Sequence, residues 1–185
     1  MKLLPILALA ALAACGSTVT RLEAPAAAPA LSLTSRVGSV VVRDVILPTY
    51  AAGEELALET EPGVITSDGE LLAADDPSRA MTLAVASRMD AILNAVVSPE
   101  PWPFPGLSDV IVDIRVSQAL GSAVTGTYTL AGQYFIGGDA IDFPMTAQSF
   151  SYQIPLRTRD IPGAVQAQSI AVAQLSEEIS RRLSR

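Results

Sequence analysis

The sequence predicts an α+β fold: a single domain in which a mainly antiparallel sheet is packed by two amphipathic helices. Two apolar stripes at helical spacing, one in the middle of the chain and one at its C-terminal end, predict the helices. Short segments rich in β-branched and alternating residues precede and separate these stripes. Helices that are segregated in this way against an antiparallel sheet are typical of the α+β class.

The first residues of the chain have the features of a secretory signal peptide. Lys2 supplies a positive charge, an apolar stretch runs from Leu3 to Leu12, and small residues precede the cleavage point. The stretch is shorter than the roughly 20 residues that a membrane-spanning helix needs. We therefore expect residues 1–14 to be removed from the mature protein.

Cys15 is the only cysteine, and it completes the tetrapeptide Leu12-Ala13-Ala14-Cys15, which resembles the lipobox of bacterial lipoproteins. The resemblance implies that the thiol receives diacylglycerol and that the amine, exposed by cleavage, is acylated, for example with palmitate. Several acyl chains anchor a protein stably where one chain would not. The alternative is an incidental or structural cysteine at the end of an ordinary signal. In either case the mature domain can form no internal disulfide.

The mature protein is acidic and lacks several residue types that are used in catalysis. Removal of Lys2, the only lysine, changes the formal net charge from −7 to −8. This charge disfavours nucleic acid as a partner, since phosphate binding relies on clustered basic residues. The mature chain has no histidine, lysine or free cysteine, and adjacent carboxylates such as Glu177 and Glu178 point apart on a helix. We predict no catalytic residues, no cofactor and no metal site.

Residues 15–35 are predicted to form the lipidated N-terminus and a flexible tether, because residues 24–30 consist of alanine and proline. The folded domain is predicted over residues 36–185. Its first strand is expected over residues 37–47, where β-branched residues are dense. The valine run at 40–42 is expected to be buried on both faces.

Alternation over residues 55–59 predicts a second strand. Residues 64–66 are predicted to pair with residues 70–72 across Ser67-Asp68-Gly69. Asp-Gly between two apolar runs is a strong signal for a hairpin turn.

The central helix is predicted to begin at Asp76, an N-cap residue followed by proline, and to end near Val97. Its apolar stripe recurs at spacings of three and four residues, which predicts a side that faces the core. The stripe comprises Met81, Val85, Met89, Ile92 and Val96. The alternative is that its methionines line a ligand groove, since methionine adapts to variable shapes.

Residues 98–106 contain prolines at alternate positions, a pattern that predicts a stiff connecting loop. Trp102 and Phe104 lie on this loop as large apolar side chains. We favour the interpretation that they fold back as a lid on the core. The alternative is that they form a partner-binding surface.

The C-terminal half predicts three strands and a second helix. The strands are expected over residues 110–116, 125–135 and 143–154, and their short connections predict an antiparallel meander. An amphipathic helix is predicted over residues 163–183, with basic residues in its last turn, where they complement the helix dipole. Its apolar face comprises Val165, Ser169, Val172, Leu175, Ile179 and Leu183.

Taken in order, residues 37–183 resemble the PqiC-like ABC-type transport auxiliary lipoproteins, which are membrane-integrity-associated transporter subunits. The resemblance lies in the valine strand that ends in Leu47-Pro48-Thr49-Tyr50, the central helix followed by Pro101-Trp102, and the terminal helix with Ala167-Gln168-Ser169 before Leu175-Ser176-Glu177-Glu178-Ile179. The chain departs from the family at the start of the central helix. There, Pro77-Ser78-Arg79-Ala80 stands where the family commonly has an Arg-Trp-Ala cluster.

The resemblance implies a non-enzymatic periplasmic lipoprotein, anchored in the outer membrane, in a system that moves lipid between the two membranes. Its implied partners are an MCE-type (mammalian cell entry) substrate-binding protein and an inner-membrane ABC permease and ATPase. A homo-oligomer is also implied, because a tethered end piece must meet a symmetric conduit. Gly16 fits outer-membrane sorting, since aspartate at this position would often signal inner-membrane retention. The alternative function is a structural or pilot-type assembly lipoprotein of an outer-membrane complex.

Overall fold

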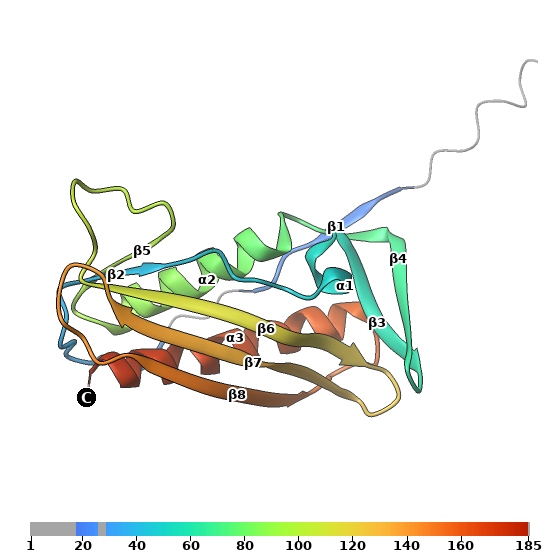
Figure 1. The fold of residues 1–185 in the computed structure, drawn as a ribbon. Coiled ribbons are helices and arrows are strands. Elements are labelled where there is room, and N and C mark those ends of the chain that lie inside the picture. Colours follow the sequence, from blue (N-terminus) through green and yellow to red (C-terminus); the bar gives the residue numbers. More distant parts are fainter. Residues whose placement is uncertain (1–17, 26–28, 185) are drawn as a thin grey trace, which may run out of the picture.

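An eight-stranded sheet with two long helices packed against one of its faces forms the fold of the described residues (Figure 1). The computed structural model describes residues 18–25 and 29–184. The long helices are α2 (Pro77–Ile92) and α3 (Ile161–Leu183), and a short helix, α1 (Thr49–Ala52), adds to the predicted elements. This arrangement confirms the prediction of a single α+β domain with two amphipathic helices.

The longest strand, β6 (Val110–Ser122), is the centre of the sheet. One of its edges pairs antiparallel with β7 (Thr127–Gly138), and β7 pairs antiparallel with β8 (Thr146–Pro155). These pairings confirm the predicted meander. The turn between β6 and β7 ends at Gly126, whose φ of 74° is a left-handed conformation that glycine adopts without strain.

The other edge of β6 is shared by two shorter strands. β2 (Ser39–Val42) pairs in parallel with the start of β6, and β3 (Glu55–Glu61) pairs in parallel with its last two residues. β5 (Val96–Pro99) adds to the free edge of β2, again in parallel. The valines at 40–42 are at most 6% exposed, so the prediction that this run is buried is confirmed.

The predicted hairpin across Asp68-Gly69 is wrong, because β4 (Val64–Ala73) runs through these residues. β4 pairs antiparallel with β3, and the chain reverses at Gly63, which has a φ of 76°. The register between the two strands shifts next to Asp68, so the Asp-Gly sequence begins a bulge rather than a turn. Within it, Asp68 Oδ1 accepts a 2.9 Å hydrogen bond from the Glu70 N–H.

Part of the predicted tether is folded onto the domain. β1 (Thr20–Leu22) pairs in parallel with the end of β4. Leu33 packs against the core, and its N–H donates a 2.7 Å hydrogen bond to the Ile92 carbonyl. The prediction of a flexible tether over residues 15–35 is wrong for these two stretches. β1 pairs with backbone groups that the edge of the sheet would otherwise leave unpaired. The stretch at Leu33 is stabilised by burial of the leucine side chain.

α2 begins as predicted, since Asp76 Oδ1 accepts a 2.8 Å hydrogen bond from the Arg79 N–H and Pro77 is the first helical residue. The predicted core side is buried for Met81, Val85, Met89 and Ile92. The helix ends at Ile92, before the predicted end near Val97. The β-branched residues Val96 and Val97 belong instead to β5, where Val96 is exposed.

α3 begins two residues before its predicted start, and Asp160 Oδ1 accepts a 2.8 Å hydrogen bond from the Gly163 N–H. Its predicted apolar face is buried at Val165, Val172, Leu175, Ile179 and Leu183, whereas Ser169 is half-buried. The two long helices run in the same direction, with both C-terminal ends at one end of the domain (Figure 1). There, the Arg36 N–H donates a 2.9 Å hydrogen bond to the Leu183 carbonyl.

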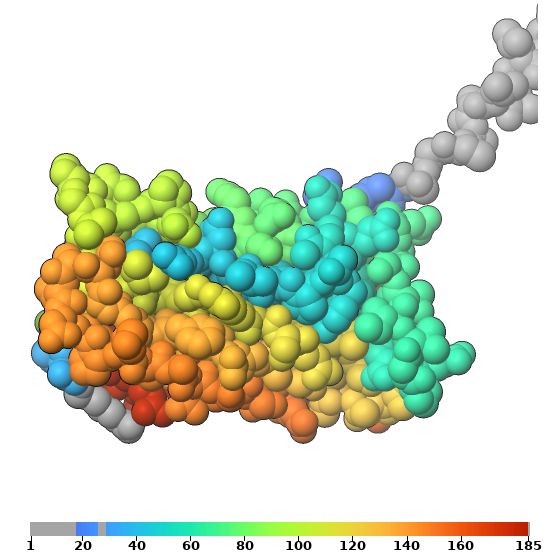
Figure 2. Space-filling model, viewed as in Figure 1, coloured from blue at the N-terminus to red at the C-terminus, as the bar shows by residue number. Residues whose placement is uncertain are grey.

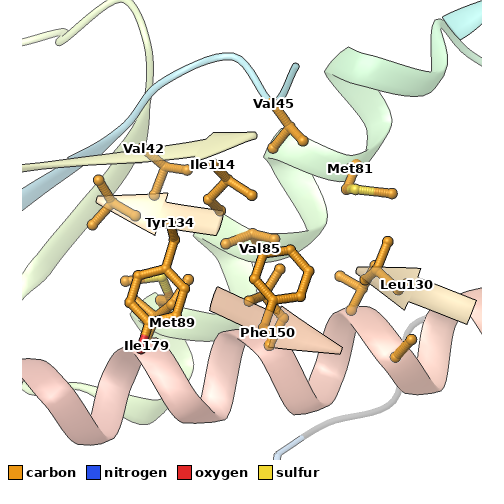
Figure 3. Packing of buried hydrophobic residues seen from close by; sticks show 14 of the residues in the cluster. Val42, Val45, Met81, Val85, Met89, Ile114, Leu130, Tyr134, Phe150 and Ile179 are labelled. Carbon is orange, nitrogen blue, oxygen red and sulfur yellow. The ribbon is translucent and has the colours of Figure 1, made fainter. Parts of the chain in front are cut away.

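The core lies between the helices and the sheet (Figure 3). Two tyrosines, the fully buried Tyr134 on β7 and the half-buried Tyr152 on β8, donate hydrogen bonds of 3.0 Å and 2.5 Å to the two carboxylate oxygens of Glu178 on α3. Burial, together with these bonds to Glu178, raises the pKa of Tyr134 to about 12 and that of Tyr152 further. One carboxylate therefore connects α3 to the last two strands of the meander.

Replacement of Ile179 by alanine tests the packing of α3. The side chain is fully buried, so Ile179→Ala should lower the free energy of unfolding by about 2–5 kcal/mol. Ile170→Ala on the same helix is the matched control, because Ile170 is 46% exposed and its loss should change stability by less than about 0.5 kcal/mol. Urea unfolding followed by circular dichroism measures both values. Equal losses would contradict the assignment of the buried face.

The raised tyrosine pKa predicts a loss of stability in alkali. An unfolded tyrosine ionises near pH 10, whereas Tyr134 in the folded protein ionises at about 12. The folded state therefore holds the proton more tightly, and this contribution is complete below pH about 10 and is lost as the pH rises through about 12. Tyr134→Phe should show a smaller fall in unfolding free energy over this interval. Identical pH dependence in urea titrations of the two proteins would refute this prediction.

Candidate functional site

The predicted lipidation residue, Cys15, lies outside the described residues, which begin at Thr18. Within the ranges 18–25 and 29–184, no helix is long and apolar enough to cross a membrane. The same part of the chain contains no cluster of three or more acidic, histidine or cysteine side chains that could hold a metal ion. Two apolar features of the surface, a projecting loop and a groove, are the candidate sites.

The first feature is the loop over residues 100–107, which connects β5 to β6 and projects from the body of the domain (Figure 2). Trp102 and Phe104 pack against each other in an edge-to-face pair, with ring centroids 5.1 Å apart. Phe104 is 53% exposed and Leu107 is 65% exposed. We name this surface, formed by Trp102, Phe104 and Leu107, the aromatic loop.

The interpretation of Trp102 and Phe104 as a lid on the core is wrong. Neither side chain belongs to the core cluster or to the residues packed against it. The alternating prolines stiffen the loop, because each fixes its own φ and restricts the residue before it, and the stiff loop projects from the domain instead of folding onto the core (Figure 2). Gly106, with a φ of 84°, then turns the chain towards β6.

The aromatic loop also carries an unsatisfied hydrogen-bond donor. The indole Nε1 of Trp102 is shielded from solvent, and no acceptor for it occurs among the described residues. A buried N–H without a partner costs about 1–3 kcal/mol relative to one that is paired. The loop therefore combines exposed apolar surface with a hydrogen-bond donor that has no acceptor among the described residues.

The second feature is a groove of about 1000 Å³ on the side of the domain that carries the helices. Most of its walls come from four separated segments: the chain after β1, α1 with the start of β3, α2 and α3. Several of the lining side chains on the two long helices are small, among them Ala80, Ala84, Ala91 and Ala173. Leu83 and Ile170, which are both exposed, also line the groove.

The two arginines that line the groove are engaged in ion pairs. Arg88 Nη2 donates a 2.7 Å hydrogen bond to Glu177 Oε1 between α2 and α3, and Arg79 pairs with Asp75 where α2 begins. Of the methionines in the α2 stripe, Met81 lines the groove, whereas Met89 is enclosed in the core. The alternative of a methionine-lined ligand groove therefore applies to Met81 alone.

Tyr50, at the end of the Leu47-Pro48-Thr49-Tyr50 motif, has a structural role beside the groove. Its hydroxyl accepts a 3.1 Å hydrogen bond from the Ala119 N–H of β6. Pro48 precedes the first residue of α1, and the short helix places Tyr50 against the side of β6. The motif thus fixes α1, which forms part of the groove wall.

The sequence singled out the aromatic loop residues, with a binding surface as the alternative to a lid, and pointed to the groove only through Met81. Trp102 and Phe104 stand out because large apolar side chains are unusual among prolines. The groove residues carry no common signal, since alanines are frequent in any helix and the four segments are distant in sequence.

Comparisons with known proteins agree with this fold. The family of ABC-type transport auxiliary lipoprotein components matches residues 21–180. No protein of curated function matches the chain. A solved structure described as an uncharacterized protein has a TM-score of 0.70 at 18% identity and covers 90% of this chain and 99% of its own. Protein XCC0632 from Xanthomonas campestris, of the DUF330 family, has a TM-score of 0.62 at 14% identity, with 84% and 92% covered.

The family match begins within β1 and ends within α3, so it includes the aromatic loop and all walls of the groove. It spans most of the chain and the whole meander. The two solved structures share the fold over nearly their full lengths. The chain therefore belongs to the family of ABC-type transport auxiliary lipoprotein components.

Proposed function

We propose that this chain is an outer-membrane-anchored periplasmic lipoprotein and a non-enzymatic subunit of an ABC-type system that moves lipid between the two membranes. The observation that carries the proposal is the family match over residues 21–180, because it assigns an auxiliary role in transport. The lipobox-like tetrapeptide that ends at Cys15 supports the lipid anchor. The apolar groove has a volume within the range of known ligand pockets and supports a hydrophobic cargo.

In this function the aromatic loop is the surface that docks on the transport partner, an MCE-type protein. Tryptophan and other aromatic side chains are enriched among the residues that dominate binding energy at protein interfaces. The stiff proline framework reduces the entropy lost on binding, since the loop is ordered beforehand. Burial of Phe104 and Leu107, which are both more than half exposed, would supply the apolar area.

The lipid anchor is tested by Cys15→Ala. Without the thiol, diacylglycerol cannot be attached, so the protein should leave the membrane fraction and lose the mass of its lipid. Thr18→Ala is the control, because it changes the same stretch and keeps the lipidation residue. Fractionation of cells and mass spectrometry measure both properties. A Cys15→Ala protein that still partitions with membranes at the same mature mass would contradict the anchor.

The docking role is tested by Trp102→Ala. Because Trp102 packs on Phe104 and not on the core, the change should cost about 0.5–1.5 kcal/mol, the value of an aromatic pair, instead of the about 3–5 kcal/mol of a buried tryptophan. Capture of the MCE-type partner by the purified protein should fall at least tenfold, since interface hot spots contribute about 2 kcal/mol or more.

Val64→Ala is the matched control for the docking experiment. Val64 is also exposed, but it lies in the β3–β4 hairpin, distant from the aromatic loop in the fold (Figure 1). It should leave both stability and capture unchanged. Full capture by the Trp102→Ala protein would exclude the loop as the docking surface.

A further inference from the structure

The anchored end of the domain is fixed by β1. Arg21 Nη1 donates hydrogen bonds of 2.8 Å to the Ala73 carbonyl and 3.2 Å to Glu54 Oε2, and the Leu22 carbonyl accepts a 2.9 Å bond from the Ala74 N–H. These contacts add to the parallel pairing of the strand with β4. The chain is therefore attached to the sheet from Thr20 onward.

This attachment shortens the segment that connects the lipid to the folded domain. The alanine- and proline-rich residues 24–30 come after β1, so they do not separate Cys15 from the fold. Only residues 16–19 lie between Cys15 and β1. Fully extended, the chain from Cys15 to Thr20 spans at most about 18 Å, whereas a tether that continued to residue 35 would span about 70 Å.

The aromatic loop lies at the other end of the domain (Figure 1). β1 pairs with the end of β4, just before α2 begins at Pro77. The loop follows β5, which starts shortly after α2 ends at Ile92. The sixteen residues of α2, a length of about 24 Å, run from the β1 end of the domain towards the other end.

We infer that the lipidated protein holds its β1 end at the surface of the bilayer and presents the aromatic loop away from it. The inference rests on the proposed lipid anchor at Cys15 and adds which surface meets the membrane. That surface includes the exposed carboxylate of Glu23 and two more carboxylates, Glu54 and Asp75, which are paired with Arg21 and Arg79. Acidic side chains are not attracted to anionic headgroups, so the short connection to the lipid, and not charge, keeps this end at the bilayer.

The chain is well suited to a test with site-specific labels. The thiol of Cys15 is consumed by the lipid, so one introduced cysteine is the only reactive thiol of the mature protein. Glu70→Cys, on β4 beside β1, marks the anchored end, and Leu107→Cys marks the aromatic loop. Each full-length lipidated protein is labelled with a donor dye and reconstituted in phosphatidylcholine vesicles that contain an acceptor-labelled lipid. Energy transfer should be higher from position 70 than from position 107.

Leu22→Pro tests whether β1 sets the distance. Proline cannot donate a hydrogen bond to the neighbouring strand, so β1 should detach and the segment between the lipid and the fold should lengthen. Energy transfer from position 70 should then fall towards the value at position 107. Glu23→Pro is the matched control. Residue 23 lies just after β1, and a proline there favours the extended conformation that Leu22 already has. Energy transfer from position 70 should therefore not change. Arg21→Ala, which keeps the strand backbone, should give a smaller fall in transfer.

The outcomes separate the inference from the proposed function. Equal transfer from the two positions, or no effect of Leu22→Pro while circular dichroism shows a folded domain, would overturn the inference and leave the anchor intact. A wild-type protein that does not float with the vesicles would overturn the anchor and the inference together.

Discussion

The fold depends on the pairing of one long strand on both edges. β6 gives one edge to β7 and divides the other between β2 and β3. Between these two partners, the backbone of Ile46 exchanges hydrogen bonds with Ile114 and Val116, and the Tyr50 hydroxyl accepts from Ala119. The segment from β2 to α1 is thus held against β6 without being a continuous strand. This edge of β6 therefore sets the position of the elements that pair with β2 and β3. These include β5 with the aromatic loop on one side, and β4 with β1 on the other.

The close approach of α3 to β6 is a second consequence of this arrangement. A Cβ atom on Gly121 would lie 2.6 Å from the Cβ of Ala164, so the absence of a side chain lets the start of the helix contact the strand directly. Further along, Glu178 receives hydrogen bonds from tyrosines on β7 and β8. The helix is therefore fixed at its start by contact with the strand and near its end by hydrogen bonds. These contacts set the position of α3, which forms one wall of the groove.

The elements with a local pattern, including the strands β2 and β3, were predicted from the sequence, whereas β1, β5 and the pairing of distant strands were not. The stripes of α2 and α3 and the meander are local patterns that repeat over many residues. The parallel pairs of β2 with β5 and β6 join residues far apart in the chain, and only a few residues pair in each. Asp68-Gly69 has the composition of a turn, yet pairing with β3 uses it as a bulge. The same holds for the candidate sites. The aromatic loop has a local sequence signal, whereas the groove and the attachment of β1 depend on contacts between residues that are distant in the sequence.

The position of Trp102 gives the protein an intrinsic optical reporter. It is the only tryptophan in the chain, and it lies on the aromatic loop rather than in the core. Indole emission responds to the polarity around the ring, so excitation selective for tryptophan observes the loop alone and is insensitive to core tyrosines. Contact of the loop with another molecule can therefore be followed in the unmodified protein, separately from unfolding of the domain.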